Sequence, residues 1–135
     1  MIVRNTPVIS IVDDDEAVRL ALRSLVRSLG YASNVFASAE EFLESSYLNE
    51  TSCLISDVQM PGMNGIELQC RLKRLDCRTP VILITAFPDE RSRARALEAG
   101  AIGFMEKPFE GRAMIHLIET ALRPRRERGS NHASK

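Results

Sequence analysis

The stretch LISDVQMPGMNG, residues 54–65, decides how the rest of the chain is interpreted. Its apolar run ends at the carboxylate of Asp57, and Pro61, Gly62 and Gly65 follow almost at once. A short, unbroken apolar run bounded by turn residues is typical of a strand buried on both faces. An aspartate after such a strand is usually a turn former or a helix cap. Asp57 is therefore either an ordinary turn residue or a reactive group at the end of a buried strand.

Similar apolar runs recur along the chain and predict strands over residues 8–12, 32–36, 53–56, 81–84 and 101–105. Between most of them, apolar residues are spaced three or four apart, as one face of a helix requires. Strands that alternate with helices predict a parallel sheet covered on both faces. Because crossovers are right-handed, few topologies remain, and a doubly wound, flavodoxin-like α/β fold of order 2-1-3-4-5 suits five strands and five helices.

Capping residues divide the chain at the same places. Small polar residues at a helix start accept hydrogen bonds from its first N–H groups, and glycine readily adopts the left-handed conformation that ends a helix. The predicted signals are Asp14 or Asp15 before the first helix, Gly30 after it, a capping box of Ser38 and Glu41 at the second, Asp89 before the fourth, Gly100 after it, and a fifth helix over residues 110–122.

Composition limits the classes of function. The 135 residues suit one domain, and 44% hydrophobic with 27% charged residues is ordinary for a globular protein. A formal net charge of zero gives no support to direct binding of nucleic acid or of a membrane surface. No segment approaches the roughly 20 apolar residues of a membrane span. The three cysteines lack metal-ligand spacing, which favours the reducing cytoplasm as the location.

The predicted strand order brings polar residues together, because parallel strands end at a common edge of the sheet. Asp13 and Asp14 follow the first strand, Asp57 the third, Thr85 the fourth and Lys107 the fifth. Clustered carboxylates repel one another, and a divalent cation relieves that repulsion. Oxygen ligands with room for water favour Mg²⁺. The ammonium group of Lys107 can meet a phosphoryl oxygen, and Thr85 offers a hydroxyl donor beside the small Ala86.

These motifs carry a family resemblance. Asp13-Asp14, DVQMPGMNG over residues 57–65, Thr85-Ala86 and Lys107-Pro108-Phe109 together resemble the receiver domain of bacterial two-component response regulators, of the CheY-like superfamily. The resemblance covers roughly residues 6–123. Stretches EAGA and MEKPFE, residues 98–101 and 105–110, are similar to the FixJ-type subgroup.

The resemblance implies a chemistry for the acidic residues. Asp57 is similar to the phosphoacceptor, which takes a phosphoryl group from the phosphohistidine of a sensor histidine kinase. Asp14 and Asp57 would bind Mg²⁺ directly, the backbone carbonyl of Gln59 would be a third ligand, and Asp13 would act indirectly.

The resemblance also assigns the residues around them. Lys107 would pair with the phosphoryl group, and its bond to Pro108 would be cis. Thr85 and Phe104 would be switch residues, Thr85 bonding the phosphoryl group and Phe104 moving inward. The positions that would flank the site are Gln59, Ala86, Phe87 and Pro108, with Gln59 and Phe87 tuning the access of water.

The partners expected from the resemblance are a sensor histidine kinase and a second copy of the chain. Phosphorylation would favour a homodimer through the fourth helix, fifth strand and fifth helix, bordered by Arg91, Arg93 and Arg95. His116 lies on a predicted solvated helix face, so it is not expected to be a phosphotransfer residue. Residues 1–123 would form the receiver, and residues 124–135 a disordered basic tail or the start of a linker to an output domain.

Two alternatives remain at the level of sequence. One is a Mg²⁺-dependent phosphohydrolase of the haloacid dehalogenase type, which also uses an aspartate nucleophile. That family needs an Asp-x-Asp-x-Thr/Val pattern after its first strand, and here Ala17 stands at the last position. The other is a pseudo-receiver that acts without phosphorylation. The favoured interpretation is a signalling switch with no enzymatic activity beyond assisting its own phosphorylation and dephosphorylation. It would change its partner contacts and thereby regulate transcription.

Overall fold

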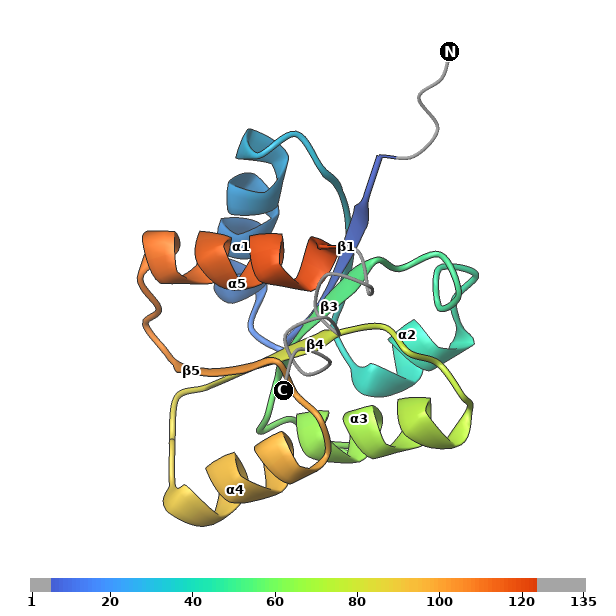
Figure 1. Ribbon diagram of the computed structural model, residues 1–135, viewed down its shortest axis with the longest axis vertical. Helices are drawn as coiled ribbons and strands as arrows, with labels where there is room; N and C mark the ends of the chain where they lie inside the picture. Colours follow the sequence, from blue (N-terminus) through green and yellow to red (C-terminus); the bar gives the residue numbers. More distant parts are fainter. Residues whose placement is uncertain (1–5, 124–135) are drawn as a thin grey trace, which may run out of the picture.

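The computed structural model describes residues 6–123 of the chain. Within that range, five parallel strands form one sheet in the order β2-β1-β3-β4-β5, as the sequence predicts (Figure 1). The elements in chain order are β1 (Val8–Val12), α1 (Glu16–Ser28), β2 (Ala32–Phe36), α2 (Ala39–Glu44), β3 (Cys53–Asp57), α3 (Gly65–Arg74), β4 (Val81–Thr85), α4 (Glu90–Glu98), β5 (Gly103–Glu106) and α5 (Gly111–Leu122).

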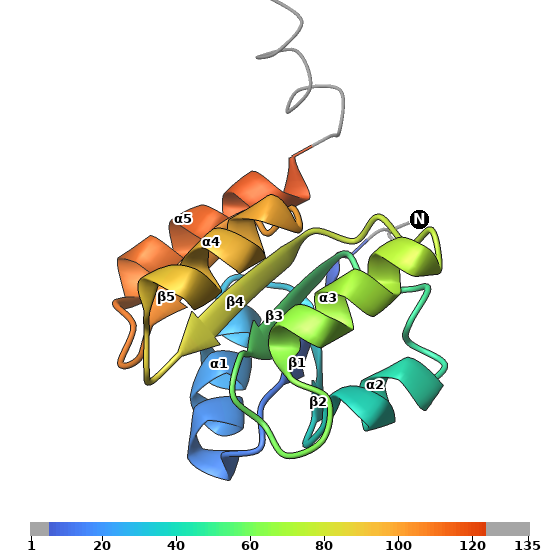
Figure 2. The same ribbon diagram turned by 90° about the horizontal axis from the view of Figure 1, so that it is seen from below.

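Helices cover both faces of the sheet, as Figures 1 and 2 show. Successive strand residues point to opposite faces, so each strand contributes to two cores. In β3, Leu54 packs with α2, α3 and α4, whereas Ile55 packs with α1 and α5. Every residue of β3 and of β4 is buried, which explains why these runs are apolar without alternation.

The strand ends differ slightly from the predicted ones. Both β3 and β4 run one residue further, so Asp57 and Thr85 are the last residues of their strands. The fifth strand begins at Gly103, two residues later than predicted. The reason is that the N–H of Ala101 donates to the Ala96 carbonyl at 3.0 Å and thereby closes the end of α4. Residues 101 and 102 are apolar because they pack, although they lie outside the strand.

The helix caps confirm most predictions. Asp15, one of the two candidates, caps α1, and Asp89 caps α4. Gly30 and Gly100 have φ of +89° and +99°, the left-handed conformation expected after a helix. The predicted second capping box is half right. Ser38 accepts from the Glu41 N–H, but the Glu41 carboxylate accepts from the N–H of Ala37, one residue earlier than a capping box requires.

A complete capping box starts α3. The Asn64 side chain accepts from the Glu67 N–H, and the Glu67 carboxylate accepts from the Asn64 N–H. The next residue, Gly65, lies so close to the strand that a Cβ there would overlap the carbonyl oxygen of Asp57. Only glycine can therefore place the first turn of α3 against the main chain of Asp57.

Among residues 6–123, none of the helices has both the length and the apolar character that a bilayer crossing requires. The prediction of a disordered tail or linker over residues 124–135 falls outside the described residues.

Asp76 generates a prediction about stability. Among residues 6–123 it is the non-glycine residue with positive φ, +59°, in the turn between α3 and β4, where an L side chain is strained. Its ion pair with Arg78 is long, 3.9 Å, and exposed, so it contributes little. We expect Asp76→Gly to raise the free energy of unfolding by about 0.5–1 kcal/mol, and Asp76→Ala to lower it by a similar amount.

Urea denaturation of both variants, with unchanged dependence on denaturant, measures this difference. Equal stability of the glycine and alanine variants would show that the turn is not strained.

Candidate functional site

Four strands deliver polar residues to one edge of the sheet. Asp13 follows β1, Asp57 ends β3, Thr85 ends β4, and Lys107 follows β5. Because the strands are parallel, their carboxyl ends lie at the same side, where the arrowheads of β3 and β4 point in Figure 2. The N–H of Lys107 donates to the Thr85 carbonyl at 2.7 Å, which joins the last two of these residues directly.

Lys107 lies between two buried carboxylates. Its Nζ is 3.0 Å from Asp13 Oδ2 and 3.3 Å from Asp57 Oδ1. The Asp13 side chain is fully buried and Asp57 is 3% exposed, so water screens these contacts poorly. The Lys107–Pro108 peptide bond is cis, as the family resemblance implied.

Three carboxylates form the acidic cluster of Asp13, Asp14 and Asp57. Each residue offers one carboxylate oxygen, and these three oxygens all lie within 4.8 Å of one another. Asp13 and Asp57 are buried, whereas Asp14 is exposed. The N–H of Asp15 donates to Asp13 Oδ1 at 2.9 Å, and Arg19 Nη1 donates to the Asp13 carbonyl at 2.7 Å. The cluster is therefore fixed on its inner side and open on the side of Asp14.

The surroundings shift the pKa values of the buried groups. Burial, followed by the neighbouring charge of Asp13, raises the pKa of Asp57 to about 6. Burial also raises the pKa of Asp13. Burial alone would lower the pKa of Lys107, but its contacts with Asp13 and Asp57 outweigh that effect and raise it. Lys107 stays charged, and the two carboxyl groups share its charge.

The acidic cluster fits a hard divalent cation. Within residues 6–123, no donor other than the Lys107 ammonium reaches Asp13 Oδ2 or Asp57 Oδ1. Three carboxylates against one ammonium leave an excess of negative charge at a partly buried position. The donors are all oxygen, and one carboxylate is open to water, which is the donor set that Mg²⁺ prefers.

Thr85 belongs to a small hydrogen-bond network beside the cluster. Its Oγ1 donates to Gln59 Oε1 at 2.5 Å and accepts from the N–H of Phe87 at 3.0 Å. Thr85 is fully buried, whereas Gln59, Ala86, Phe87 and Pro108 are exposed around it. The predicted flanking residues therefore form the outer rim of this edge.

Phe104 is the second residue of β5 and lies next to α4. Its ring is partly buried and packs against the core under α2, α3 and α4. The guanidinium carbon of Arg93 lies 6.0 Å from the ring centroid, at the limit of a cation–π contact. Two of the three elements of the predicted partner face, α4 and β5, thus meet through these two side chains. His116 is exposed on α5, as the sequence predicted.

One contact near the site was missed by sequence reasoning. Glu40 Oε2 accepts from the Met63 N–H at 3.0 Å, and this hydrogen bond lowers the pKa of Glu40. An acid from the first turn of α2 therefore holds the loop between β3 and α3. The sequence gives no signal for it, because an acid in a first helical turn already has a reason to be there.

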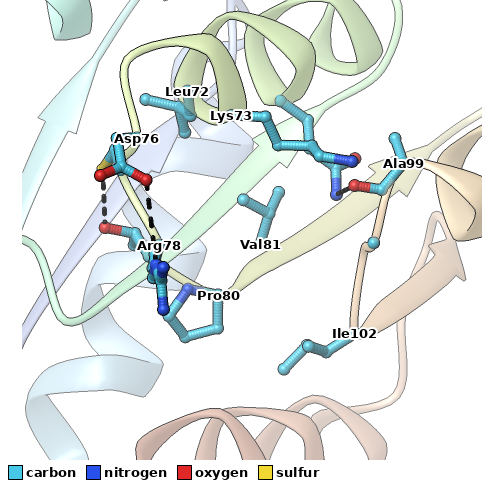
Figure 3. Close-up of a pocket in the computed structure, with 12 residues that line it drawn as sticks. Leu72, Lys73, Asp76, Arg78, Pro80, Val81, Ala99 and Ile102 are labelled. Carbon is cyan, nitrogen blue, oxygen red and sulfur yellow. Dashed lines mark hydrogen bonds and ion pairs between the residues drawn. The ribbon is translucent and has the colours of Figure 1, made fainter.

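A cavity also lies away from this edge of the sheet. It has a volume of about 440 Å³ and lies between the ends of α3 and α4 and the start of β4. Figure 3 shows Leu72, Asp76, Pro80, Val81 and Ile102 around it. Since Pro80 precedes β4 and Thr85 ends it, this cavity is at the opposite end of the strand from the acidic cluster.

A doubly wound sheet of order 2-1-3-4-5 with an acidic cluster, a hydroxyl and a lysine at the carboxyl edge defines the receiver class of signalling domains. The comparisons agree. The family model described as "Response regulator receiver domain" matches residues 9–119. The chain belongs to this family, whose members accept a phosphoryl group in two-component signalling.

Three similar proteins place the chain within the family. Response regulator protein TodT of Pseudomonas putida is 41% identical over 124 residues, which are 92% of this chain and 55% of TodT. Transcriptional regulatory protein FixJ of Bradyrhizobium diazoefficiens is 37% identical over 115 residues, 85% of this chain and 56% of FixJ. The solved structure of response regulator StyR is 41% identical with a TM-score of 0.83, covering 96% of this chain and 65% of StyR.

The similarity to FixJ agrees with the subgroup that the EAGA and MEKPFE stretches indicated. The chain spans about half the length of the curated relatives it matches.

The raised pKa of Asp57 predicts how stability depends on pH. In the folded, metal-free protein this carboxyl keeps its proton up to about pH 6, whereas an unfolded aspartate loses it near 3.8. The folded state therefore binds more protons between these values, and its stability falls as the pH rises through them, by about 3 kcal/mol for this group. We expect Asp57→Asn to be more stable than the wild type by about 2–3 kcal/mol at pH 7.5, and to differ little at pH 3.5.

Chemical denaturation at both pH values, in EDTA, measures the difference. Asp89→Asn is the matched control, because its exposed carboxylate has a pKa lowered by the Ser92 N–H and should give no gain at pH 7.5. A gain for Asp57→Asn that is the same at both pH values would contradict the electrostatic explanation.

Proposed function

We propose that Asp57 is the phosphoacceptor of this receiver domain and that a sensor histidine kinase is the donor. The observation that carries the proposal is the position of Asp57, at the end of a central strand, 3.3 Å from Lys107 and within the acidic cluster. A carboxylate oxygen attacks the phosphorus of the phosphohistidine, the P–N bond breaks, and the imidazole leaves with its electron pair. The product is an aspartyl phosphate.

The residues around Asp57 supply charge neutralisation, which phosphoryl transfer needs more than covalent assistance. Lys107 is the fixed positive charge that meets a phosphoryl oxygen. Asp14, Asp57 and the Gln59 carbonyl would hold Mg²⁺, with Asp13 acting indirectly through its contact with Lys107. When bound, the ion would neutralise charge on the equatorial phosphoryl oxygens.

Thr85 and Phe104 are the proposed switch residues. The Thr85 hydroxyl lies at the end of β4 beside the cluster and would bond the phosphoryl group. Its displacement would open space at the end of the strand, into which the partly buried ring of Phe104 would move. Gln59, Ala86, Phe87 and Pro108 form the rim through which water would reach the aspartyl phosphate.

The proposed role is that of a switch and not of an enzyme with turnover of small molecules. The comparisons give no support to a phosphohydrolase of the aspartate-nucleophile type. FixJ is by name a transcriptional regulatory protein, and we propose that phosphorylation of this chain also controls transcription, in the cytoplasm and without direct contact between this domain and nucleic acid.

Phosphorylation from a small donor tests the proposal. With acetyl phosphate and Mg²⁺, intact-mass measurement should show a gain of one phosphoryl group on the wild-type protein. The gain should be absent in Asp57→Asn and with EDTA, and unchanged in Asp89→Asn, which removes an acid outside the cluster. Phosphorylation of Asp57→Asn would reject the assignment of the acceptor. Absence of any adduct would favour a pseudo-receiver, and continued release of phosphate from many substrates would favour the phosphohydrolase.

A homodimer through α4, β5 and α5 is the proposed consequence of phosphorylation. Leu97 is 48% exposed on α4, one turn after Arg93, whose guanidinium lies over Phe104 of β5. An exposed leucine on this face suits an apolar contact with a second copy.

We expect sedimentation to show a monomer before phosphorylation and a dimer after it. Leu97→Asp should stay monomeric while still accepting the phosphoryl group, because a buried carboxylate without a partner is costly. Leu20→Asp is the control, since Leu20 is 42% exposed on α1, away from this face. An unchanged monomer after full phosphorylation would reject the dimer.

A further inference from the structure

The hydroxyl group of Thr85 already donates one hydrogen bond and accepts another in this structure. Its hydrogen is donated to Gln59 Oε1 at 2.5 Å, and its oxygen accepts from the Phe87 N–H at 3.0 Å. A hydroxyl carries one hydrogen, so it can donate to one acceptor at a time. Bonding to Gln59 and bonding to a phosphoryl oxygen therefore exclude each other.

We propose that the side chain of Gln59 is a positioning residue that holds Thr85 in the resting state and so opposes the switch. The inference rests on the proposed function, because it requires Thr85 to bond the phosphoryl group. The Thr85 hydroxyl must first break its hydrogen bond to the Gln59 amide oxygen. The free energy of that bond therefore opposes the bonding of Thr85 to the phosphoryl group. Gln59 thereby sets how far a given level of phosphorylation activates the domain.

The position of Gln59 suits this role. It lies two residues after Asp57 and is exposed, whereas Thr85 is fully buried. The Gln59 side chain borders a hollow that Asn64, Ser92 and Arg95 also line. Once released, its amide can turn into this hollow and be solvated, whereas a buried amide would lose a partner. The resting bond can therefore break without leaving an unsatisfied group on the Gln59 side.

Phe87 connects the same network to the surface. Its N–H donates to the Thr85 oxygen, and its ring is 71% exposed. Movement of the Thr85 hydroxyl changes the acceptor of this N–H. The loop between β4 and α4 therefore reports the state of Thr85, and the Phe87 amide gives a spectroscopic signal for the bond to Gln59.

The expected size of the effect follows from the bond. A neutral hydrogen bond changes an equilibrium constant by about 2- to 10-fold. Gln59→Met keeps a side chain of similar length, removes the strong acceptor, and leaves the backbone carbonyl of residue 59 in place. It should tighten binding of a phosphoryl mimic by about 2- to 10-fold.

A double-mutant cycle separates this role from a general effect on the site. The probe is the beryllium trifluoride anion with Mg²⁺, which mimics a phosphoryl group on a carboxylate and is not hydrolysed, so access of water does not enter the measurement. Calorimetry gives the Kd for the wild type, Gln59→Met, Thr85→Ala and the double variant. We expect the gain from Gln59→Met to vanish in the Thr85→Ala background and to persist with Thr85→Ser, which keeps the hydroxyl.

Nuclear magnetic resonance of the Phe87 amide adds a second readout. Without the probe, Gln59→Met should already shift this resonance toward its position in the probe-bound wild type. An unchanged or weaker Kd for Gln59→Met, or an equal gain in the Thr85→Ala background, would overturn the inference. Failure of the wild type to bind the probe would overturn the proposed function and the inference together, whereas wild-type binding without coupling between residues 59 and 85 would overturn the inference alone.

Discussion

Excess negative charge at the carboxyl edge of the sheet is the constraint on which the other features depend. Asp13 and Asp57 are buried beside Asp14, and Lys107 faces the two buried groups at 3.0 and 3.3 Å. Such an arrangement costs stability in the metal-free protein. It persists because the strands that carry these residues are anchored by two apolar cores, one on each face of the sheet. The two cores thus offset the electrostatic cost of the acidic cluster.

The fold and the composition of this edge follow from the sequence for a simple physical reason. Parallel strands buried on both faces give unbroken apolar runs, and those runs are visible without a structure. Once the strand order is fixed, residues that are far apart in the chain must meet at one edge. Asp57 and Lys107, 50 positions apart, are in contact for that reason. The capping residues Asp15 and Asp89 were equally visible, because their function is local.

The details that the sequence did not reveal depend on side-chain reach and loop geometry. The carboxylate of Glu41 bonds the N–H of Ala37 because the chain enters α2 in a way that periodicity does not encode. By its place in the sequence Glu40 is an ordinary first-turn acid, yet it accepts a hydrogen bond from the Met63 N–H in another loop. The bond between Thr85 and Gln59 likewise joins the end of a strand to a loop, and its existence depends on one rotamer of a flexible amide.

The glycine at the start of α3 has a mechanical consequence. Gly65 lets the helix begin flush against the carbonyl of Asp57, and its own N–H donates to the Val58 carbonyl at 3.0 Å. Because the two segments touch without room for a Cβ, a shift of the Asp57 main chain would carry the first turn of α3 with it. The proposed switch would then act through the other neighbour of β3, the strand β4, which carries Thr85 and leads to α4.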